Sequence, residues 1–401
     1  MPQDAIADPR YARTAPRRGV RLSWRDPTVR SIVWQIVIIG LVGFAVWWLV
    51  SNTMRNLEVR RIATGFGFLN REAGLPIAEA MIPYTPADTY ARALLVGILN
   101  TLRVAVIGIV LATILGTLIG IARLSRNWLL AKLAAVYVEL LRDLPLLLQL
   151  LFWYALMQGL PGPRQALNPF GSVFLSNRGI KFPWVAWEPA HTAALLALVA
   201  GIAALALLAR RFSARQMATG IRPRLWPWGL ALLLGLPAAV WAAMGAPFTI
   251  DAPVLRGFNF QGGATITPEF AALLLGLVLY TAAFIAEIVR AGILAVHTGQ
   301  WEAAGALGLS RGEQLRLIIL PQALRVIIPP MTSQYLNITK NSSLAVAIGY
   351  QDIVSIANTT LNQTGQAIEG IAIIMAVYLT ISLSISLFMN WYNARIALKE
   401  R

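Results

Sequence analysis

The chain has 401 residues, of which 57% are hydrophobic and 13% are charged, whereas soluble domains carry about 25% charged residues. A net charge of +16 could indicate nucleic-acid binding, but the arginines cluster in short loops between apolar segments, as in membrane proteins. The absence of cysteine excludes disulfides and thiolate chemistry, and His191 and His297 are too few for a His-rich metal site. The composition predicts an all-α integral membrane protein without a bound metal.

The N-terminal region predicts a tail and an anchor. Residues 1–30 are polar and rich in arginine, and the apolar run after them is too long for the core of a cleaved signal peptide. We expect a basic cytoplasmic tail over 1–30, an extra transmembrane helix over 31–50 and a periplasmic segment over 51–90.

Apolar runs recur along the chain, each long enough to cross about 30 Å of hydrocarbon. Their continuous rather than alternating pattern favours helices over the strands of a barrel. About eight spans are expected, within residues 31–50, 94–121, 128–160, 191–208, 226–244, 268–293, 326–348 and 371–391.

Two of these spans carry further local signals. The spacing Gly116-x-x-x-Gly120 in the second span predicts a flat surface for close helix packing. The third region is too long for one crossing, and Pro145, which lacks an amide donor, should break its helix. We therefore expect a helix at the inner leaflet, followed by a crossing that begins near Leu146.

The arginine-rich loops lie after the second span, between the fourth and fifth, around segment 301–321 and at the C-terminus. They alternate with loops that are poor in cations, such as 350–370. By the positive-inside rule both termini and segment 301–321 should be cytoplasmic. An even number of spans agrees with this orientation.

The chain lacks signatures of an enzyme. A phosphate-binding loop needs a lysine after a glycine, and no lysine of this chain follows one. No HExxH or GxSxG motif is present either. We therefore expect no catalytic residue here, and if ATP drives the protein, a partner chain must bind it.

Segment 301–321, WEAAGALGLSRGEQLRLIILP, is the one long polar loop that is built like a docking element. A short helix is expected over 302–306, and Gly308 should end it. Ser310-x-x-Glu313 is a capping box that should start a second helix over 311–319, which should stop at Pro321. For an arbitrary polar loop, an ordinary solvated turn would be the favoured alternative.

Glu302-Ala303-Ala304, then Gly308, then Ile318 and Leu320-Pro321, resembles the EAA loop of ABC importer permeases. The stretches YVELLRDLPL (137–146), AEIVRAG (286–292) and KNSSL (340–344) resemble the polar amino acid branch of that family. The resemblance covers the second, third, sixth, seventh and eighth spans. It implies a five-helix type I importer core over 91–160 and 268–395, with 161–267 as an insertion that carries periplasmic loops and an extra helix pair.

The enlarged layout resembles the permease subunits of general L-amino acid importers. One departure is Asp143, which stands where shorter relatives usually have glycine. In the family the EAA loop forms coupling helices that insert into a cleft on the ATPase subunit. The resemblance therefore assigns a coupling role to Glu302, Ala303, Ala304, Gly308 and Leu309.

The resemblance also implies partners and a location. It indicates an ATP-driven, binding-protein-dependent importer that moves L-amino acids across the cell inner membrane by alternating access. The partners would be a second, related permease chain, two ATPase subunits that bind ATP and Mg²⁺, and a periplasmic amino-acid-binding protein. Neither a cofactor in this chain nor a nucleic-acid partner is expected.

Polar groups at membrane depth are costly and tend to mark function. Lys340, or an unwound stretch at Asn341, Ser342 and Ser343, could hold the substrate carboxylate, as broken helices do in transporters. Glu369 could face the ammonium group, with Asp352 as a rival. The alternative is that these polar side chains only bond helix to helix.

Two further charged pairs are candidates for gates or structural contacts. Glu287 and Arg290 lie three residues apart on one helix face, a spacing that allows an ion pair. Arg142 and Asp143 are adjacent in sequence and could contact another helix or the ATPase. The rival function is an ion-coupled secondary amino acid transporter, which would predict inverted repeats and midplane carboxylates; neither is evident in the sequence.

Overall fold

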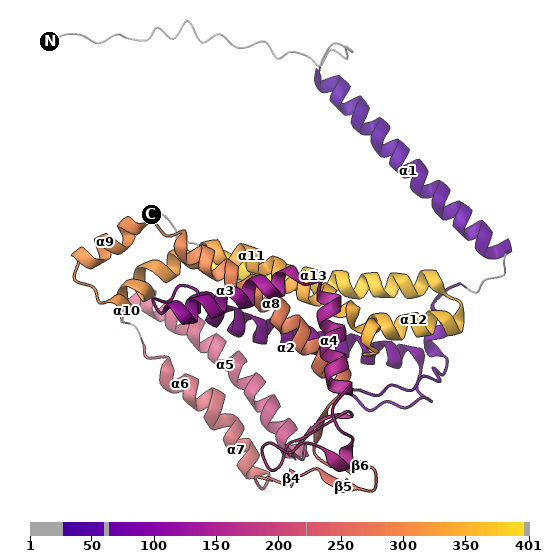
Figure 1. Ribbon diagram of the computed structural model, residues 1–401. Helices are drawn as coiled ribbons and strands as arrows, with labels where there is room; N and C mark the ends of the chain where they lie inside the picture. Colours follow the sequence, from indigo (N-terminus) through magenta and orange to yellow (C-terminus); the bar gives the residue numbers. More distant parts are fainter. Residues whose placement is uncertain (1–26, 60–63, 222, 397–401) are drawn as a thin grey trace, which may run out of the picture. The chain divides into compact units, whose positions relative to one another are not determined.

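A computed structural model describes residues 27–59, 64–221 and 223–396 (Figure 1). Most of the predicted basic tail, and the last five residues with Lys399 and Arg401, lie outside the described residues. The chain divides into two units, 1–65 and 66–401. The described part of the first unit is chiefly one helix, α1 (Pro27–Val59), which extends beyond the predicted span 31–50 at both ends.

The core of the second unit is formed by α2 (Tyr90–Ala122) and α8 (Pro268–Leu294). Glycines in α2 let the two backbones approach closely. A Cβ atom at Gly116 would lie 2.6 Å from Ile285, and one at Gly120 would lie 2.7 Å from the carbonyl oxygen of Ala286. The predicted packing surface at Gly116 and Gly120 is therefore confirmed, and its partner is α8.

The third predicted span is divided, as expected, into α3 (Trp128–Asp143) and α4 (Leu146–Gln158). Leu144 and Pro145 are extended between them. The side-chain amide of Gln149 donates to the carbonyl oxygens of Leu141 and Leu144, at 2.9 and 3.1 Å. It thereby satisfies backbone groups that the break leaves without helical partners.

The region 161–267 contains a helix pair and several short strands, which the expectation of an all-helical chain did not include. The helix pair comprises α5 (Pro189–Thr219), α6 (Trp226–Leu230), a π-helical turn η4 (Ala231–Gly235) and α7 (Leu236–Ala243). The remaining elements are η3 (Pro163–Gln165), β1 (Phe174–Ser176), β2 (Gly179–Phe182), β3 (Trp184–Val185), β4 (Ile250–Asp251), β5 (Val254–Arg256), β6 (Asn259–Gln261) and β7 (Ala264–Ile266).

The strands of the insertion form three antiparallel groups. The largest has the order β1-β2-β7, and the others pair β3 with β4 and β5 with β6. Ile180 in β2 lies opposite Ile266 in β7, two residues before α8 begins. The return to the core is thus fixed by backbone pairing.

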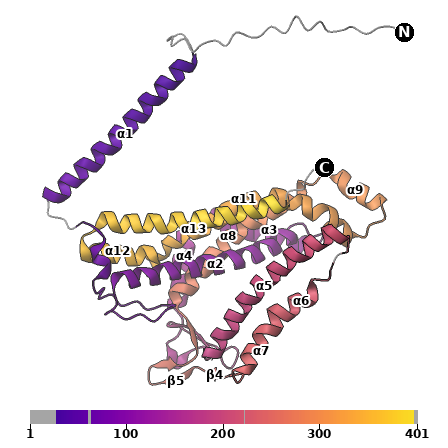
Figure 2. The same cartoon turned by 180° about the vertical axis from the view of Figure 1, so that it is seen from behind.

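The C-terminal half begins with α9 (Thr298–Ala306), α10 (Arg311–Glu313) and a π-helical turn η5 (Gln314–Ile319). It continues with α11 (Leu320–Asn341), the 3₁₀ helix η6 (Ser342–Ile348), α12 (Ile353–Thr364) and α13 (Ala367–Ile396). Both views place α9, α10 and the C-terminal end of α13 at one end of the second unit, and α12 at the other (Figures 1 and 2).

The predicted helix stop at Pro321 is wrong. Pro321 lies in the first turn of α11, directly after the π-helical turn, and the chain continues as helix to Asn341. Proline is tolerated here because the π-helical turn before it already departs from the α-helical hydrogen-bond pattern that proline would otherwise break. The sequence analysis also left 350–370 as a loop, whereas α12 occupies most of it.

Among the described residues, seven helices are long and apolar enough to cross a membrane, with α4 as a shorter apolar helix. These eight elements correspond to the predicted spans. The α4 segment has 13 residues, or about 20 Å of helix. It is therefore shorter than the hydrocarbon layer of about 30 Å.

Candidate coupling segment and translocation path

The residues of the predicted coupling segment form a compact projection at one end of the second unit (Figure 1). Glu302 and Ala303 are exposed on α9, whereas Ala304 is buried and anchors the helix. Gly308 has φ +72°, a left-handed conformation that ends α9 and that residues with a side chain rarely adopt.

The second half of the projection is held by side-chain bonds to the backbone. The carboxylate of Glu313 accepts from the backbone amide and the hydroxyl of Ser310, at 2.9 and 2.6 Å, so the predicted capping box is present. The side-chain amide of Gln314 donates to the backbone carbonyl oxygen of Leu309 at 2.8 Å. Leu307, at the tip, is 76% exposed. The projection thus combines a fixed backbone with an exposed apolar tip, which suits insertion into a cleft of another protein.

The polar residues of the seventh span lie where α11 changes into η6. Lys340 is exposed, and Ser342 is fully buried. The hydroxyls of Ser342 and Ser343 each donate to a carbonyl oxygen of their own helix at 2.7 Å. The backbone tightens here to a 3₁₀ helix, so the predicted unwinding is limited to a change of helix type.

Two carboxylates that the sequence analysis proposed for an ammonium group lie beyond this point. Asp352, at the start of α12, is fully buried and accepts from the amide of Ser355 at 2.9 Å and from the hydroxyl of Tyr378 at 3.3 Å. Burial raises the pKa of Asp352 to about 7. Glu369 is also buried, in the first turn of α13.

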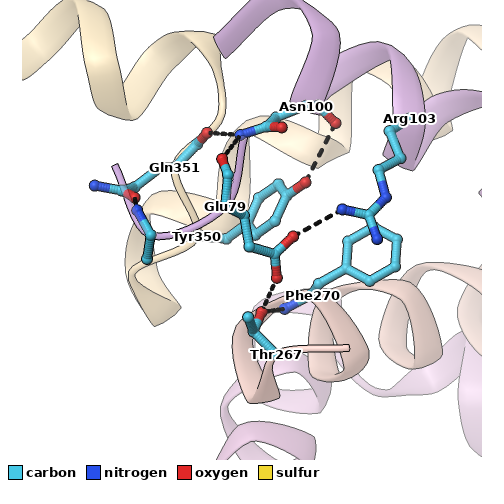
Figure 3. Close-up of polar contacts among 8 residues, drawn as sticks. Glu79, Asn100, Arg103, Thr267, Phe270, Tyr350 and Gln351 are labelled. Atoms are coloured by element: carbon cyan, nitrogen blue, oxygen red, sulfur yellow. Dashed lines mark hydrogen bonds and ion pairs between the residues drawn. The ribbon is translucent and has the colours of Figure 1, made fainter. Parts of the chain in front are cut away.

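A polar cluster at the same end of the unit was missed by the sequence analysis (Figure 3). The carboxylate of Glu79 accepts from the hydroxyl of Thr267 and from the guanidinium of Arg103 at 2.9 Å. The Arg103 guanidinium also lies 4.0 Å from the centre of the Phe270 ring. One carboxylate therefore joins α2 to the start of α8.

The same cluster fixes the segment that precedes α2. Asn100 donates to the carbonyl oxygens of Glu79 and Gln351, both at 2.9 Å. The side chain of Gln351 accepts from the amide of Ala78 at 2.6 Å and donates to the carbonyl oxygen of Pro76 at 3.0 Å. A cavity of about 430 Å³ adjoins these contacts and also borders Glu269 and Tyr350.

The charged residues of α8 form a three-member group near the opposite end. Arg290 donates to Glu287 at 2.6 Å, and Arg123, at the end of α2, pairs with the same carboxylate. The sequence spacing indicated the pair of Glu287 and Arg290 but not the participation of Arg123. The ion pair between Arg123 and Glu287 holds α2 against α8 near Gly120, where the two backbones pack closely.

Arg142 and Asp143 lie at the end of α3, and both are exposed. The guanidinium of Arg142 lies 5.0 Å from the centre of the Phe284 ring on α8. The expected contact of Arg142 with another helix is therefore present as a cation–π interaction.

The chain matches known proteins over nearly its whole length. A model of binding-protein-dependent transport system inner membrane components matches residues 228–398. The chain is 53% identical over 395 residues to the general L-amino acid transport system permease protein AapQ of Rhizobium johnstonii, covering 97% of this chain and 98% of that protein. The chain belongs to this family of permeases.

Two other family members show how the match is distributed. The glutamate/glutamine/aspartate/asparagine transport system permease protein BztB of Rhodobacter capsulatus is 45% identical over 423 residues, covering 96% of this chain and 98% of that protein. The glutamate/aspartate import permease protein GltJ of Escherichia coli K12 is 39% identical over 129 residues, covering 32% of this chain and 52% of that protein. The permease thus has relatives that share its full length, including the insertion.

The family match includes the coupling segment and the polar end of α11, and it places the chain among the components of binding-protein-dependent systems. The rival assignment as an ion-coupled secondary transporter is not favoured. Within the described part of this permease, no group of three or more His, Cys, Asp or Glu residues could hold a metal ion.

The missed residues of the permease differ in how visible they are in sequence. Arg103 lies inside the predicted span 94–121, where a charged residue indicates a functional site. Glu79 lies in a loop without a distinctive pattern, and its partner Thr267 is 188 residues away. The sequence therefore gives a signal for Arg103 but none for Glu79, the carboxylate with which it pairs.

Proposed function

We propose that this chain is the translocation subunit of an ATP-driven importer that moves L-amino acids into the cytoplasm by alternating access. The observation that carries the proposal is the identity of 53% to AapQ, a general L-amino acid transport permease, over 97% of this chain. That match includes the insertion 161–267 as well as the five-helix core over 91–160 and 268–395.

The ATPase subunits would dock on the projection formed by α9 and α10. Glu302, Ala303 and Leu307 are exposed on it, while Ala304 and the capping box keep its shape. In this proposal ATP and Mg²⁺ bind only to the ATPase partners. Docking there requires the cytoplasm to lie at that end. With an even number of spans, both termini of the chain would then be cytoplasmic, and the membrane would be the cell inner membrane.

The substrate would pass the buried polar groups at the other end of α11. Asn341, Ser342 and Ser343 offer amide and hydroxyl donors for a carboxylate, after the serine hydroxyls leave their present backbone acceptors. Among the described residues, Asp352 and Glu369 are the buried carboxylates, and either would face the ammonium group in this proposal. Lys340 is exposed at the same level and could attract the carboxylate before it enters.

The remaining partners follow from the single coupling projection per chain. Two ATPase subunits need two projections, so a second permease chain, related to this one, would complete the pathway. A periplasmic binding protein would deliver the amino acid at the end that carries α12 and the Glu79 cluster. The Glu79–Arg103 pair at that end and the group of Glu287, Arg290 and Arg123 near the opposite end would hold the helices together in alternate stages.

The proposal is tested by amino acid uptake into vesicles that contain the permease, its partner chain, the ATPase and the binding protein. We expect Gly308→Asp to abolish ATP-dependent uptake and Glu302→Ala to reduce it, with the membrane subunits still assembled. Uptake that needs only an ion gradient, and that neither substitution alters, would refute the proposal.

Gly220 provides the matched control. It has φ +70° against +72° for Gly308, and a Cβ atom at either position would meet no described atom within 4 Å. Gly220→Asp therefore introduces the same backbone strain and the same charge at a helix end outside the projection. Equal loss of uptake in both variants would attribute the effect to general strain and remove the support for docking.

A further inference from the structure

A basic hollow lies between the end of α5 and the end of α13, outside the sites described above. It has a volume of about 600 Å³ and is bordered by Arg210 and Ser213 of α5 and by Trp391 and Arg395 of α13. Alanine side chains at 206, 209 and 214 leave room for it. Both views place these helix ends beside the end that carries α9 and α10 (Figures 1 and 2).

Within the part of the chain that the structure describes, the positive charge of the hollow has no carboxylate partner. Among the residues that the structure describes, neither Arg210 nor Arg395 pairs with a carboxylate. The sequence contains no acidic residue between Glu188 and Asp251, and α13 carries a single one, Glu369, at its far end. Two guanidinium groups therefore face the hollow without a carboxylate partner among the described residues, which end at 396.

The depth of the hollow matches the surface of a bilayer. From Pro189 to Ala209, α5 carries no Asp, Glu, Lys or Arg, a length of about 30 Å, which equals the hydrocarbon thickness. The uncharged part of α13, from Gly370 to Ala394, is about 38 Å long and therefore also long enough to cross this layer, with some tilt. Arg210 and Arg395 thus reach the level of the lipid headgroups together.

The walls around the hollow are suited to a lipid. The guanidinium of Arg395 lies 4.4 Å from the centre of the Trp391 ring, an aromatic residue of the type that settles at membrane interfaces. Nearer the membrane centre, Leu207 of α5 and Leu387 of α13 are 60% and 70% exposed. An acidic protein segment would leave these apolar side chains uncovered, whereas acyl chains would cover them.

We propose that the hollow binds an anionic phospholipid, with its phosphate between Arg210 and Arg395 and its acyl chains along the exposed faces of α5 and α13. The lipid would bridge the inserted helix pair to the core. The site requires neither substrate nor ATP, and it is independent of the transport proposal. Basic pockets between helices are a recognised arrangement for such headgroups.

The test is native mass spectrometry of the assembled complex in detergent, titrated with phosphatidylglycerol, phosphatidylcholine and inorganic phosphate. We expect saturable binding of phosphatidylglycerol, weaker binding of phosphatidylcholine and no displacement by phosphate. The double variant R210Q/R395Q should bind phosphatidylglycerol roughly 30-fold more weakly, because each arginine contributes roughly fivefold to anionic-lipid attraction.

The matched control is R211Q/R215Q, which removes the same charge from the same helix end at two exposed residues that do not border the hollow. Its affinity should stay close to that of the wild type. Equal losses in both double variants would show diffuse charge attraction and overturn the proposal. Displacement of the lipid by phosphate alone, or cross-linking of Arg210→Cys to an acidic segment of a partner protein, would also overturn it.

Discussion

The core helix α2 and the inserted helix α5 are almost equally apolar but differ in burial. The most apolar stretches of α2 and α5 have mean hydropathies of 2.6 and 2.5. Of the residues in the most apolar stretch of each helix, 33% are buried in α2 and 61% in α8, whereas 6% are buried in α5 and none in the helical stretch 226–243. Hydropathy reports contact with lipid or protein alike, so it does not separate a packed helix from a peripheral one.

The difference lies in contacts that hydropathy does not record. The α2–α8 contact combines Gly116 and Gly120, which admit the facing backbone, with the Arg123–Glu287 ion pair. The inserted pair has a single comparable point at Gly201, where α5 meets the backbone of Leu232. Four substitutions can break or sharpen this contrast.

The largest effect is expected for Gly120→Leu. A Cβ atom there would lie 2.7 Å from the carbonyl oxygen of Ala286 and 2.9 Å from Val289, and the backbone of α8 has no room to retreat. We expect a loss of about 3 kcal/mol or more of stability, seen as aggregation in size-exclusion chromatography. Gly43→Leu in α1, where a Cβ atom would meet no described atom within 4 Å, is the control and should elute normally.

Gly201→Leu should cause a smaller, local change. The new side chain would strike the carbonyl group of Leu232 and push α5 from the α6–α7 segment. Because the core does not depend on this contact, the protein should assemble while the connection between α5 and α6 becomes sensitive to protease. Loss of the whole fold would show that the insertion supports the core.

Glu287→Gln should weaken the core without distorting its shape. The substitution removes the shared partner of Arg123 and Arg290, whose side chains are 14% and 32% exposed. We expect a loss on the order of 2 kcal/mol, measured by thermal unfolding in detergent. Glu302→Gln, at an exposed acid on α9, should leave the melting temperature unchanged; an equal shift would point to net charge instead.

The smallest effect, over a single pH unit, is the pH dependence from Asp352. Its pKa is raised to about 7 in the fold by burial, so its contribution is fully present below about pH 4 and is lost as pH rises through about 7. In that window the wild type should lose about 1 kcal/mol of stability per pH unit relative to Asp352→Asn. Parallel melting curves for both proteins would contradict this, and the acid-free inserted pair should add no such dependence.

The sequence predicted those features that depend on neighbouring residues. The spans, the break at Pro145, the capping box at Ser310 and the glycine surface of α2 all follow from local rules of hydrogen bonding and side-chain size. The start of α12 also carries a local signal, since Asp352 caps it and Gly365 ends it with φ +72°. We nevertheless predicted a loop there, because the segment is polar and short.

Other features depended on contacts between distant residues. The Glu79 cluster joins a loop to α2, α8 and the residues before α12, and each member alone has an unremarkable sequence setting. The role of Pro321 depended on the π-helical turn before it, which changes the backbone partners that proline would otherwise disrupt. The substrate-path residues remain predictions, because the side-chain roles require a bound amino acid.

The π-helical turn at Gln314–Ile319 has a mechanical consequence. It joins α10 to α11 without a loop, and α11 passes directly into η6. The α9–α10 projection is therefore joined to η6 by one continuous helical segment, whose α11 part alone is 22 residues, or about 33 Å, long. Pro329 and Pro330 lie inside α11, and proline inside a helix favours a kink. The segment ends at Gly349, next to Tyr350 and Gln351, so the backbone itself links the projection to the Glu79 cluster, and the two prolines mark the place where that link bends most easily.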